Sequence, residues 1–147
     1  MTGVFAKLNL KDQTRIIVLD PPESFEKELA ALKGVDIVRD LKKARQLSFS
    51  LAFVTTQKQV DALAPAIGRK AEGDAIVWLA YPKGSSKKYK SEINRDHGWE
   101  PFGREGFEPV RMVAIDEDWS ALRLRRAEFI KTMTRPKDAR LTERSKT

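Results

Sequence analysis

The chain has 147 residues, of which 41% are hydrophobic and 33% charged, with a formal net charge of +7 and no cysteine. This length fits a single domain, and the composition is that of globular proteins rather than of disordered or fibrous ones. The lack of cysteine excludes disulfides, thiolate nucleophiles and cysteine-ligated metals, and no apolar run approaches the roughly 20 residues that a membrane-spanning helix needs.

The two ends of the chain differ from its middle. Residues 1–14 have neither the apolar stretch nor the small-residue cleavage site of a secretion signal, so the sequence predicts an N-terminal extension here and a cytoplasmic protein. Residues 123–147 hold nine Lys or Arg and three Asp or Glu, a net charge of +6. Residues 127–147 are predicted to be a flexible basic tail, which helps solubility or, as the alternative, contacts nucleic acid through counterion release.

The first predicted elements are a strand and a helix. RIIVL (15–19) is a β-branched run with the length of a buried strand. In the following DPPESFEKELAALKG, Asp20 is a candidate helix cap, Pro21 stands at the first helical position and Glu23 completes a capping box. Gly34 is placed to end this helix in the left-handed conformation.

Two short strands and a longer helix come next. VDIV (35–38) and SLAFV (50–54) predict strands, and residues 40–47 predict one or two helical turns. The longer helix is capped by one of two consecutive threonines (55–56). Pro65 is expected to kink or interrupt this helix, because proline removes a backbone donor.

The second half of the chain predicts the centre and one end of a sheet. AIVWLAY (75–81) is apolar at every position, which is typical of a central strand in a parallel sheet covered on both faces. A polar loop and a helix over about 91–105, broken near Gly98 and Pro101, lead to PVRMVAI (109–115), and an acidic turn leads on to WSALRLR (119–125). The short connection between these strands requires an antiparallel hairpin. The prediction is an α/β domain over 15–126: a three-layer α/β/α Rossmann-like sheet, mostly parallel, with a C-terminal antiparallel hairpin.

This pattern resembles two known groups of proteins. A Rossmann-like sheet that closes with an antiparallel hairpin resembles the fold of the S-adenosylmethionine-dependent methyltransferases. The segments IVWLAYPKGSS, INRD and VAIDEDWSALRLR resemble, more specifically, a bacterial family of small proteins of unknown function. That family has a W-x-x-Y-P-K strand, an N-R-D element and a D-x-W-S-A-L-R strand. The resemblance implies a self-contained domain without a recognised catalytic centre.

The turn after the first strand argues against a nucleotide cofactor. Dinucleotide-binding folds place glycines there so that backbone amides approach the phosphates. Here the turn is DPPESF, with no glycine, two prolines that lack amide donors, and the carboxylates of Asp20 and Glu23. The letters DPPE are close to the [DN]-P-P-[YFW] signature of amino-methyltransferases, but Glu23 stands where that signature has an aromatic residue. The sequence therefore predicts no cofactor, with S-adenosylmethionine less strongly disfavoured because it carries no phosphate.

Other catalytic or metal-binding patterns are weak. His97 is the single histidine and stands outside any G-x-S-x-G turn, so neither a Ser-His-Asp triad nor a zinc site is indicated. The acidic run of residues 116–118 between two strands is better explained as a hairpin turn. A Mg²⁺ ion bound by these carboxylates is the open alternative.

The stretch after the central strand is the candidate site. Open α/β sheets bind ligands beyond the carboxyl ends of their strands. At that place this segment has positive charges, hydroxyl groups and a glycine whose backbone no side chain hinders. The predicted ligand-binding residues, for a small anion, are Lys83, Gly84, Ser85, Ser86, Asn94, Arg95 and Asp96. The alternative is a solvated loop in which Arg95 and Asp96 pair with other groups of the chain.

Trp119 and Arg123 form a second candidate. Period-two alternation places them on one face of the last strand with Ala121, while Leu122 and Leu124 face the other way into the core. Trp119 is interpreted as packing, with a ligand shelf formed by Trp119 and Arg123 as the alternative.

The resulting functional hypothesis is a non-catalytic binding or accessory module with an anion-accepting crevice. One alternative is a minimal methyltransferase-like enzyme that uses the same crevice. Another is a nucleic-acid contact made by the lysine loop and the basic tail, for which Tyr89 and Trp99 are the available stacking residues.

Overall fold

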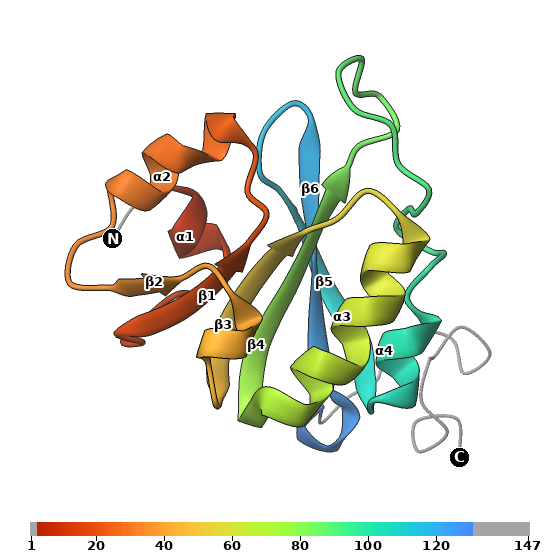
Figure 1. Cartoon of the computed structure of the whole chain (residues 1–147). Helices are drawn as coiled ribbons and strands as arrows, with labels where there is room; N and C mark the ends of the chain where they lie inside the picture. The colour runs from red at the N-terminus through yellow and green to blue at the C-terminus, as the bar shows by residue number, and fades with distance from the viewer. Residues whose placement is uncertain (1–2, 131–147) are drawn as a thin grey trace.

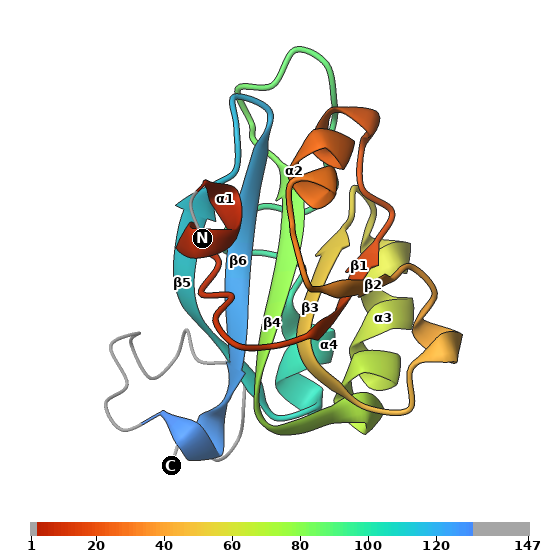
Figure 2. The same cartoon turned by 90° about the vertical axis from the view of Figure 1, so that its left-hand side faces the viewer.

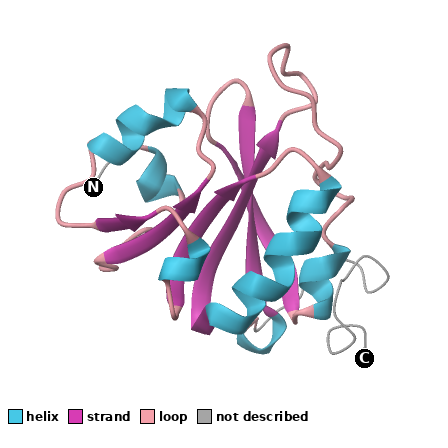
Figure 3. Ribbon diagram, in the orientation of Figure 1, coloured by secondary structure: helices cyan, strands magenta, loops and turns pink. Residues whose placement is uncertain are grey.

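The computed structural model describes residues 3–130. The described strands are β1 (Arg15–Leu19), β2 (Asp36–Val38), β3 (Leu47–Phe53), β4 (Ala71–Pro82), β5 (Phe107–Ala114) and β6 (Trp119–Arg126). The described helices are α1 (Val4–Lys7), α2 (Glu26–Ala30), α3 (Gln57–Lys70) and α4 (Glu100–Arg104), with 3-10 turns at Glu23–Phe25, Leu41–Lys43 and Ala127–Phe129. Figure 3 shows how these helices, strands and loops alternate along the chain.

All of these strands belong to one sheet, in the order β2-β1-β3-β4-β6-β5. The pairs β1–β2, β1–β3 and β3–β4 are parallel, whereas β6 runs antiparallel to both β4 and β5. The predicted hairpin therefore forms, and its second strand lies between β4 and β5 (Figure 1). The predicted α/β/α fold class, with a mostly parallel sheet and an antiparallel end, is confirmed.

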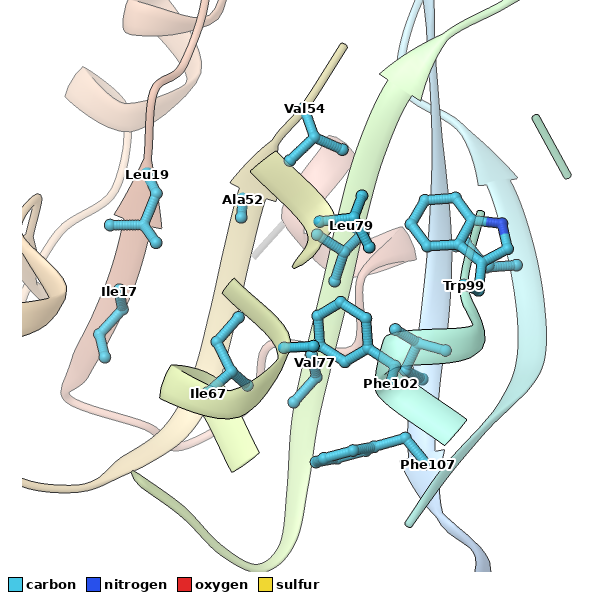
Figure 4. Close-up of a cluster of buried hydrophobic side chains, with 14 of the residues drawn as sticks. Ile17, Leu19, Ala52, Val54, Ile67, Val77, Leu79, Trp99, Phe102 and Phe107 are labelled. Carbon is cyan, nitrogen blue, oxygen red and sulfur yellow. The ribbon is translucent and has the colours of Figure 1, made fainter. Parts of the chain in front are cut away.

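Helices cover both faces of the sheet. Figures 1 and 2 show α3 and α4 on one face and α1 and α2 on the other. Figure 4 shows side chains of β1, β3 and β4 pointing toward α3 and α4, where Ile67, Phe102 and Phe107 pack among them. β4 carries Val77 and Leu79 toward this cluster and Trp78 toward the opposite one, all fully buried. Burial on both faces of the sheet therefore explains the uninterrupted apolar run at 75–81, as predicted.

The N-terminal segment is part of the domain. The sequence predicts residues 1–14 as an extension, but α1 and the turn after it bury Val4, Phe5 and Leu8 against the sheet. The indole Nε1 of Trp78 donates a hydrogen bond to the carbonyl oxygen of Leu8, with an N–O distance of 2.8 Å. A buried tryptophan needs an acceptor for its N–H, and this segment supplies it.

The helix after β1 begins later than its capping signals predict. Asp20 has φ 53° and does not cap a helix; the first 3-10 turn begins at Glu23 after an extended Pro22, and α2 is short. A residue that precedes proline is disfavoured in the helical region, so Pro21 cannot act as the first helical residue before Pro22. The predicted capping box is therefore wrong. Gly34 does have a positive φ, 70°, but beyond the end of α2.

Two other helix predictions have opposite outcomes. The threonine cap is confirmed, because Thr56 forms a capping box with Gln59. Pro65 does not interrupt α3, which continues through it, so of the two predicted effects only a kink stays a prediction. Burial of Val60 and Ile67 on the same helix offsets the one backbone bond that proline removes. Of the broken helix predicted over 91–105, only the part after Gly98 forms, as α4, and the helix predicted before Gly98 is wrong.

No helix among residues 3–130 is long and apolar enough to cross a membrane. In the predicted tail, Ala127–Phe129 form a 3-10 turn that is followed by Ile130. The rest of the tail lies outside the described residues.

Candidate ligand-binding crevice

The loop that leaves β4, residues 83–99, rises above the carboxyl edge of the sheet (Figure 1). We call it the β4 exit loop. Together with the last residues of β4 it encloses an open cavity of about 760 Å³, the crevice, which lies within the size range of small-molecule sites. Five of the predicted ligand-binding residues line it: Lys83, Gly84, Ser86, Asn94 and Arg95.

The first part of the loop is anchored to the turn between β5 and β6. The N–H of Lys83 donates to the carbonyl oxygen of Asp118, and the hydroxyl of Ser86 donates to its carboxylate, both at 2.8 Å. Asp116 Oδ1 in turn accepts the N–H groups of Asp118 and Trp119. The acidic run is thus the predicted turn, and residues 3–130 contain no group of side chains arranged to hold a metal ion.

The second part of the loop folds back on itself. Asn94 Oδ1 accepts the N–H groups of Asp96 and His97, and its carbonyl oxygen accepts the buried indole N–H of Trp99 at 2.7 Å. Gly98 has φ 106°, and a Cβ at this position would overlap the side chain of Ile93. This local folding replaces the predicted helix, because an Asn turn followed by a positive-φ glycine cannot continue helical dihedrals.

Glu92 ties the loop to the start of α3. Its N–H donates to the carbonyl oxygen of Thr55 at 2.9 Å, and its Oε1 accepts the N–H of Gln57 at 3.0 Å. The amide of Gln57 also donates to the carbonyl oxygen of Gly98 at 2.9 Å. Glu92 lines the crevice, and sequence reasoning missed it. No local signal identifies it, because its partners are far away in the sequence.

The crevice cations are available to a ligand. Within residues 3–130, the side chains of Lys83 and Arg95 form no hydrogen bond or ion pair. Burial raises the pKa of Tyr81, which lines the same cavity, while the positive charge of Arg95 opposes that rise and Asp96 adds to it. Arg95 therefore acts electrostatically on another residue that lines the crevice.

Some of the predicted residues have other roles or positions. Ser86 holds the loop through its hydroxyl, which also accepts the N–H groups of Lys88 and Tyr89. Ser85 lines a separate cavity, together with Lys87 and acidic side chains of the β5–β6 turn. Asp96 is exposed and is not among the lining residues of the crevice.

Trp119 is a packing residue. It is 4% exposed, and its ring lies 5.1 Å from that of Phe53 and 5.0 Å from that of Tyr89, measured between centroids. Arg123 pairs in register with Trp78 and is half-buried, and that burial lowers its pKa. The structure does not support the alternative of a ligand shelf, because Trp119 is covered and neither residue lines the crevice.

The exit of β1 is built differently. Asp20 takes a left-handed backbone and is followed by Pro21 and Pro22, neither of which has an N–H to offer a ligand. Arg39, just beyond β2, is engaged in a two-bond ion pair with Glu26. These residues do not form the glycine-lined, amide-bearing turn against which a nucleotide cofactor lies.

The two aromatic side chains considered for nucleic-acid stacking are partly or fully covered by other residues. Trp99 is 2% exposed, and Tyr89 packs on Trp119 while lining the crevice. Most of the basic tail lies outside the described residues. A nucleic-acid contact stays a prediction.

Comparison with known proteins supports the fold alone. No protein-family model and no curated protein matches the chain, so the resemblance to the bacterial family of unknown function has no independent support. Similar solved structures include a Sulfolobus solfataricus protein provisionally named a type 11 methyltransferase (12% identity, 84% of this chain and 88% of that one, TM-score 0.48). Another is the pyocyanin biosynthetic protein PhzM (14%, 81% and 52%, TM-score 0.49).

A third similar structure is Haemonchus contortus phosphoethanolamine N-methyltransferase 2, solved with phosphomonomethylethanolamine and S-adenosylhomocysteine. It is 11% identical, with 86% of this chain and 36% of that chain covered and a TM-score of 0.50. The chain thus spans about a third of that enzyme's length. Together with the sheet order, this likeness shows that the chain has a methyltransferase-like Rossmann fold.

Proposed function

We propose that this domain binds a small anionic ligand in the crevice beside β4. The observation that carries the proposal is an open cavity at the carboxyl edge of a parallel sheet whose lining includes Lys83 and Arg95, two cations that form no ion pair or side-chain hydrogen bond within residues 3–130. Ligands of open α/β folds bind at this edge, and a guanidinium and an ammonium suit a phosphate or carboxylate group.

The residues that line the crevice have two different roles, and this difference supports the proposal. Ser86 and Asn94 use side-chain hydrogen bonds to shape the loop, whereas the side chains of Lys83 and Arg95 form none in the part of the chain that the structure describes. Gly84 is exposed, and a Cβ there would meet nothing within 4 Å, so the backbone at this point is open to a ligand. The loop is therefore held by some residues while others face the cavity.

Titration with inorganic phosphate, followed by calorimetry, tests the proposal. Lys83→Ala and Arg95→Ala should each weaken phosphate binding by roughly 10- to 100-fold, because a charge-assisted hydrogen bond contributes about 1.5–3 kcal/mol. Lys87→Ala is the matched control: this lysine belongs to the same loop but lines the separate cavity beside Glu117. Unchanged phosphate affinity in both crevice variants would reject the assignment.

The second candidate is methyl transfer from S-adenosylmethionine in the same crevice. At the level of the fold, the comparisons favour this alternative over a non-catalytic module, since the similar structure above is a methyltransferase with S-adenosylhomocysteine. The exit of β1 weighs against it, because Pro21 and Pro22 do not fit such a cofactor.

Thermal unfolding separates the two candidates. A cofactor that binds the native state at 100 times its Kd would add about 2.7 kcal/mol of stability and raise Tm measurably. We expect S-adenosylmethionine and S-adenosylhomocysteine to leave Tm unchanged. A rise with either one would show that the domain binds this cofactor, as the enzyme-like alternative requires.

A further inference from the structure

Besides its cations, the crevice contains one fixed carboxylate. Glu92 lines the cavity, and its Oε1 is held by the N–H of Gln57 in the first turn of α3. The backbone of Glu92 is held as well, through its N–H bond to Thr55. Two anchors, one just before α3 and one in its first turn, therefore hold a negative charge in the wall of the crevice.

This carboxylate occupies the position where a helix in such a fold commonly meets an anionic ligand. Two N–H groups in the first turn of α3 already have side-chain acceptors, because Thr56 accepts the N–H of Gln59 in the capping box and Glu92 accepts that of Gln57. Since the partial positive charge of a helix N-terminus acts only over its first turn, a ligand anion placed there would meet the like charge of Glu92. A ligand anion is therefore directed away from α3, toward Lys83 and Arg95.

The remaining charged residues of the crevice make it a site of mixed charge. Lys83, Lys90 and Arg95 are its cations, and Glu92 is its carboxylate. Only one oxygen of that carboxylate accepts a hydrogen bond within the described residues, so the other can accept from a ligand. A polyanion would meet repulsion at Glu92, whereas a ligand with one anionic and one cationic group would find a partner for each.

We infer that the ligand of this crevice is a small zwitterion, with its anionic group at Lys83 and Arg95 and a protonated amine at Glu92. Glu92 is then the residue that determines specificity, by selecting against di- and triphosphates and for an amine. This inference rests on the proposed anion site and adds a cationic group to the ligand that binds there.

Two probes that differ by one amine test the inference: propyl phosphate and 3-aminopropyl phosphate. Both carry the same anionic group, so binding of propyl phosphate alone reports on the proposed anion site. We expect the amine to tighten binding by roughly fivefold, as an ion pair of about 1 kcal/mol would do.

Glu92→Gln keeps an acceptor for the N–H of Gln57 but removes the charge. In this variant propyl phosphate should bind more tightly than in the natural chain, and the advantage of the amine should disappear. Glu117→Gln is the control, since Glu117 lies in the separate cavity beside Lys87, and it should retain the advantage. A melting temperature near that of the natural chain shows that Glu92→Gln is folded.

The outcomes are distinct. If propyl phosphate does not bind, the anion site itself is wrong. If it binds but the amine adds nothing, or the advantage of the amine survives Glu92→Gln, the zwitterion inference is overturned while the anion site stands.

Discussion

The exits of β1 and β4 lie at the same edge of the sheet, but they differ in the groups that they offer a ligand. After β1, a left-handed Asp20 and two prolines turn the chain directly into a 3-10 helix, with few amide donors. After β4, residues 83–99 form an anchored loop around a cavity whose cations have no partner among residues 3–130. A shared fold therefore fixes where a ligand can bind but not which strand's exit binds it.

The largest expected effect is a loss of stability at the exit of β4. Gly98→Ala places a Cβ against Ile93 at a residue with φ 106°, where side chains are strained. We expect a loss of about 2–4 kcal/mol in the free energy of unfolding, measured by urea titration.

Gly84→Ala is the matched control for that loss. It adds the same methyl group to the same loop at a position with open space, and should change the free energy of unfolding by less than about 0.5 kcal/mol. Equal effects of the two variants would mean that the second half of the loop is not packed as described.

An effect of opposite sign is expected at the exit of β1. Asp20→Gly relieves a left-handed backbone that glycine adopts freely. We expect a gain of about 0.5–1 kcal/mol in thermal unfolding, partly offset by the greater freedom of glycine in the unfolded chain. Phosphate affinity should stay the same; a change in it would show that the β1 exit takes part in binding.

The smallest effect is expected at the ion pair that follows the β1 exit. The hydrogen bonds of Arg39 lower the pKa of Glu26, so its contribution to stability is present above the ordinary value of 4.5 and is lost as the pH falls through the lowered pKa. Both side chains are largely exposed, and solvent screens such pairs. Glu26→Gln should therefore leave Tm nearly unchanged at neutral pH. A clear drop there that disappears in acid would show a stronger pair than expected.

Much of the fold could be predicted because it depends on local patterns. Apolar runs at 15–19 and 75–81 identify strands buried in the sheet, and the short acidic connection before Trp119 requires a hairpin. Five candidate site residues also line one cavity, because the carboxyl end of a central strand is a position that topology alone determines.

The wrong predictions have a common cause. A local sequence signal can be overridden by residues that contact it only in the folded structure. A capping pattern at residues 20–23 does not form a cap, because consecutive prolines exclude the required backbone. Pro65 does not break α3, because the helix is stabilised by the side chains that it buries. The acceptor for the indole of Trp78 lies in a segment that the sequence predicts as an extension.

By itself, the sequence determined the type of each main strand, the antiparallel hairpin and the cluster of cations after β4, since backbone preference and hydrophobic pattern act within a few residues. Only the tertiary structure decided that β6 lies between β4 and β5, that α1 completes the core and that Glu92 of the β4 exit loop is held at the crevice by the start of α3. These features join residues far apart in the chain, and their energy comes from shared burial and hydrogen bonds that no local pattern records.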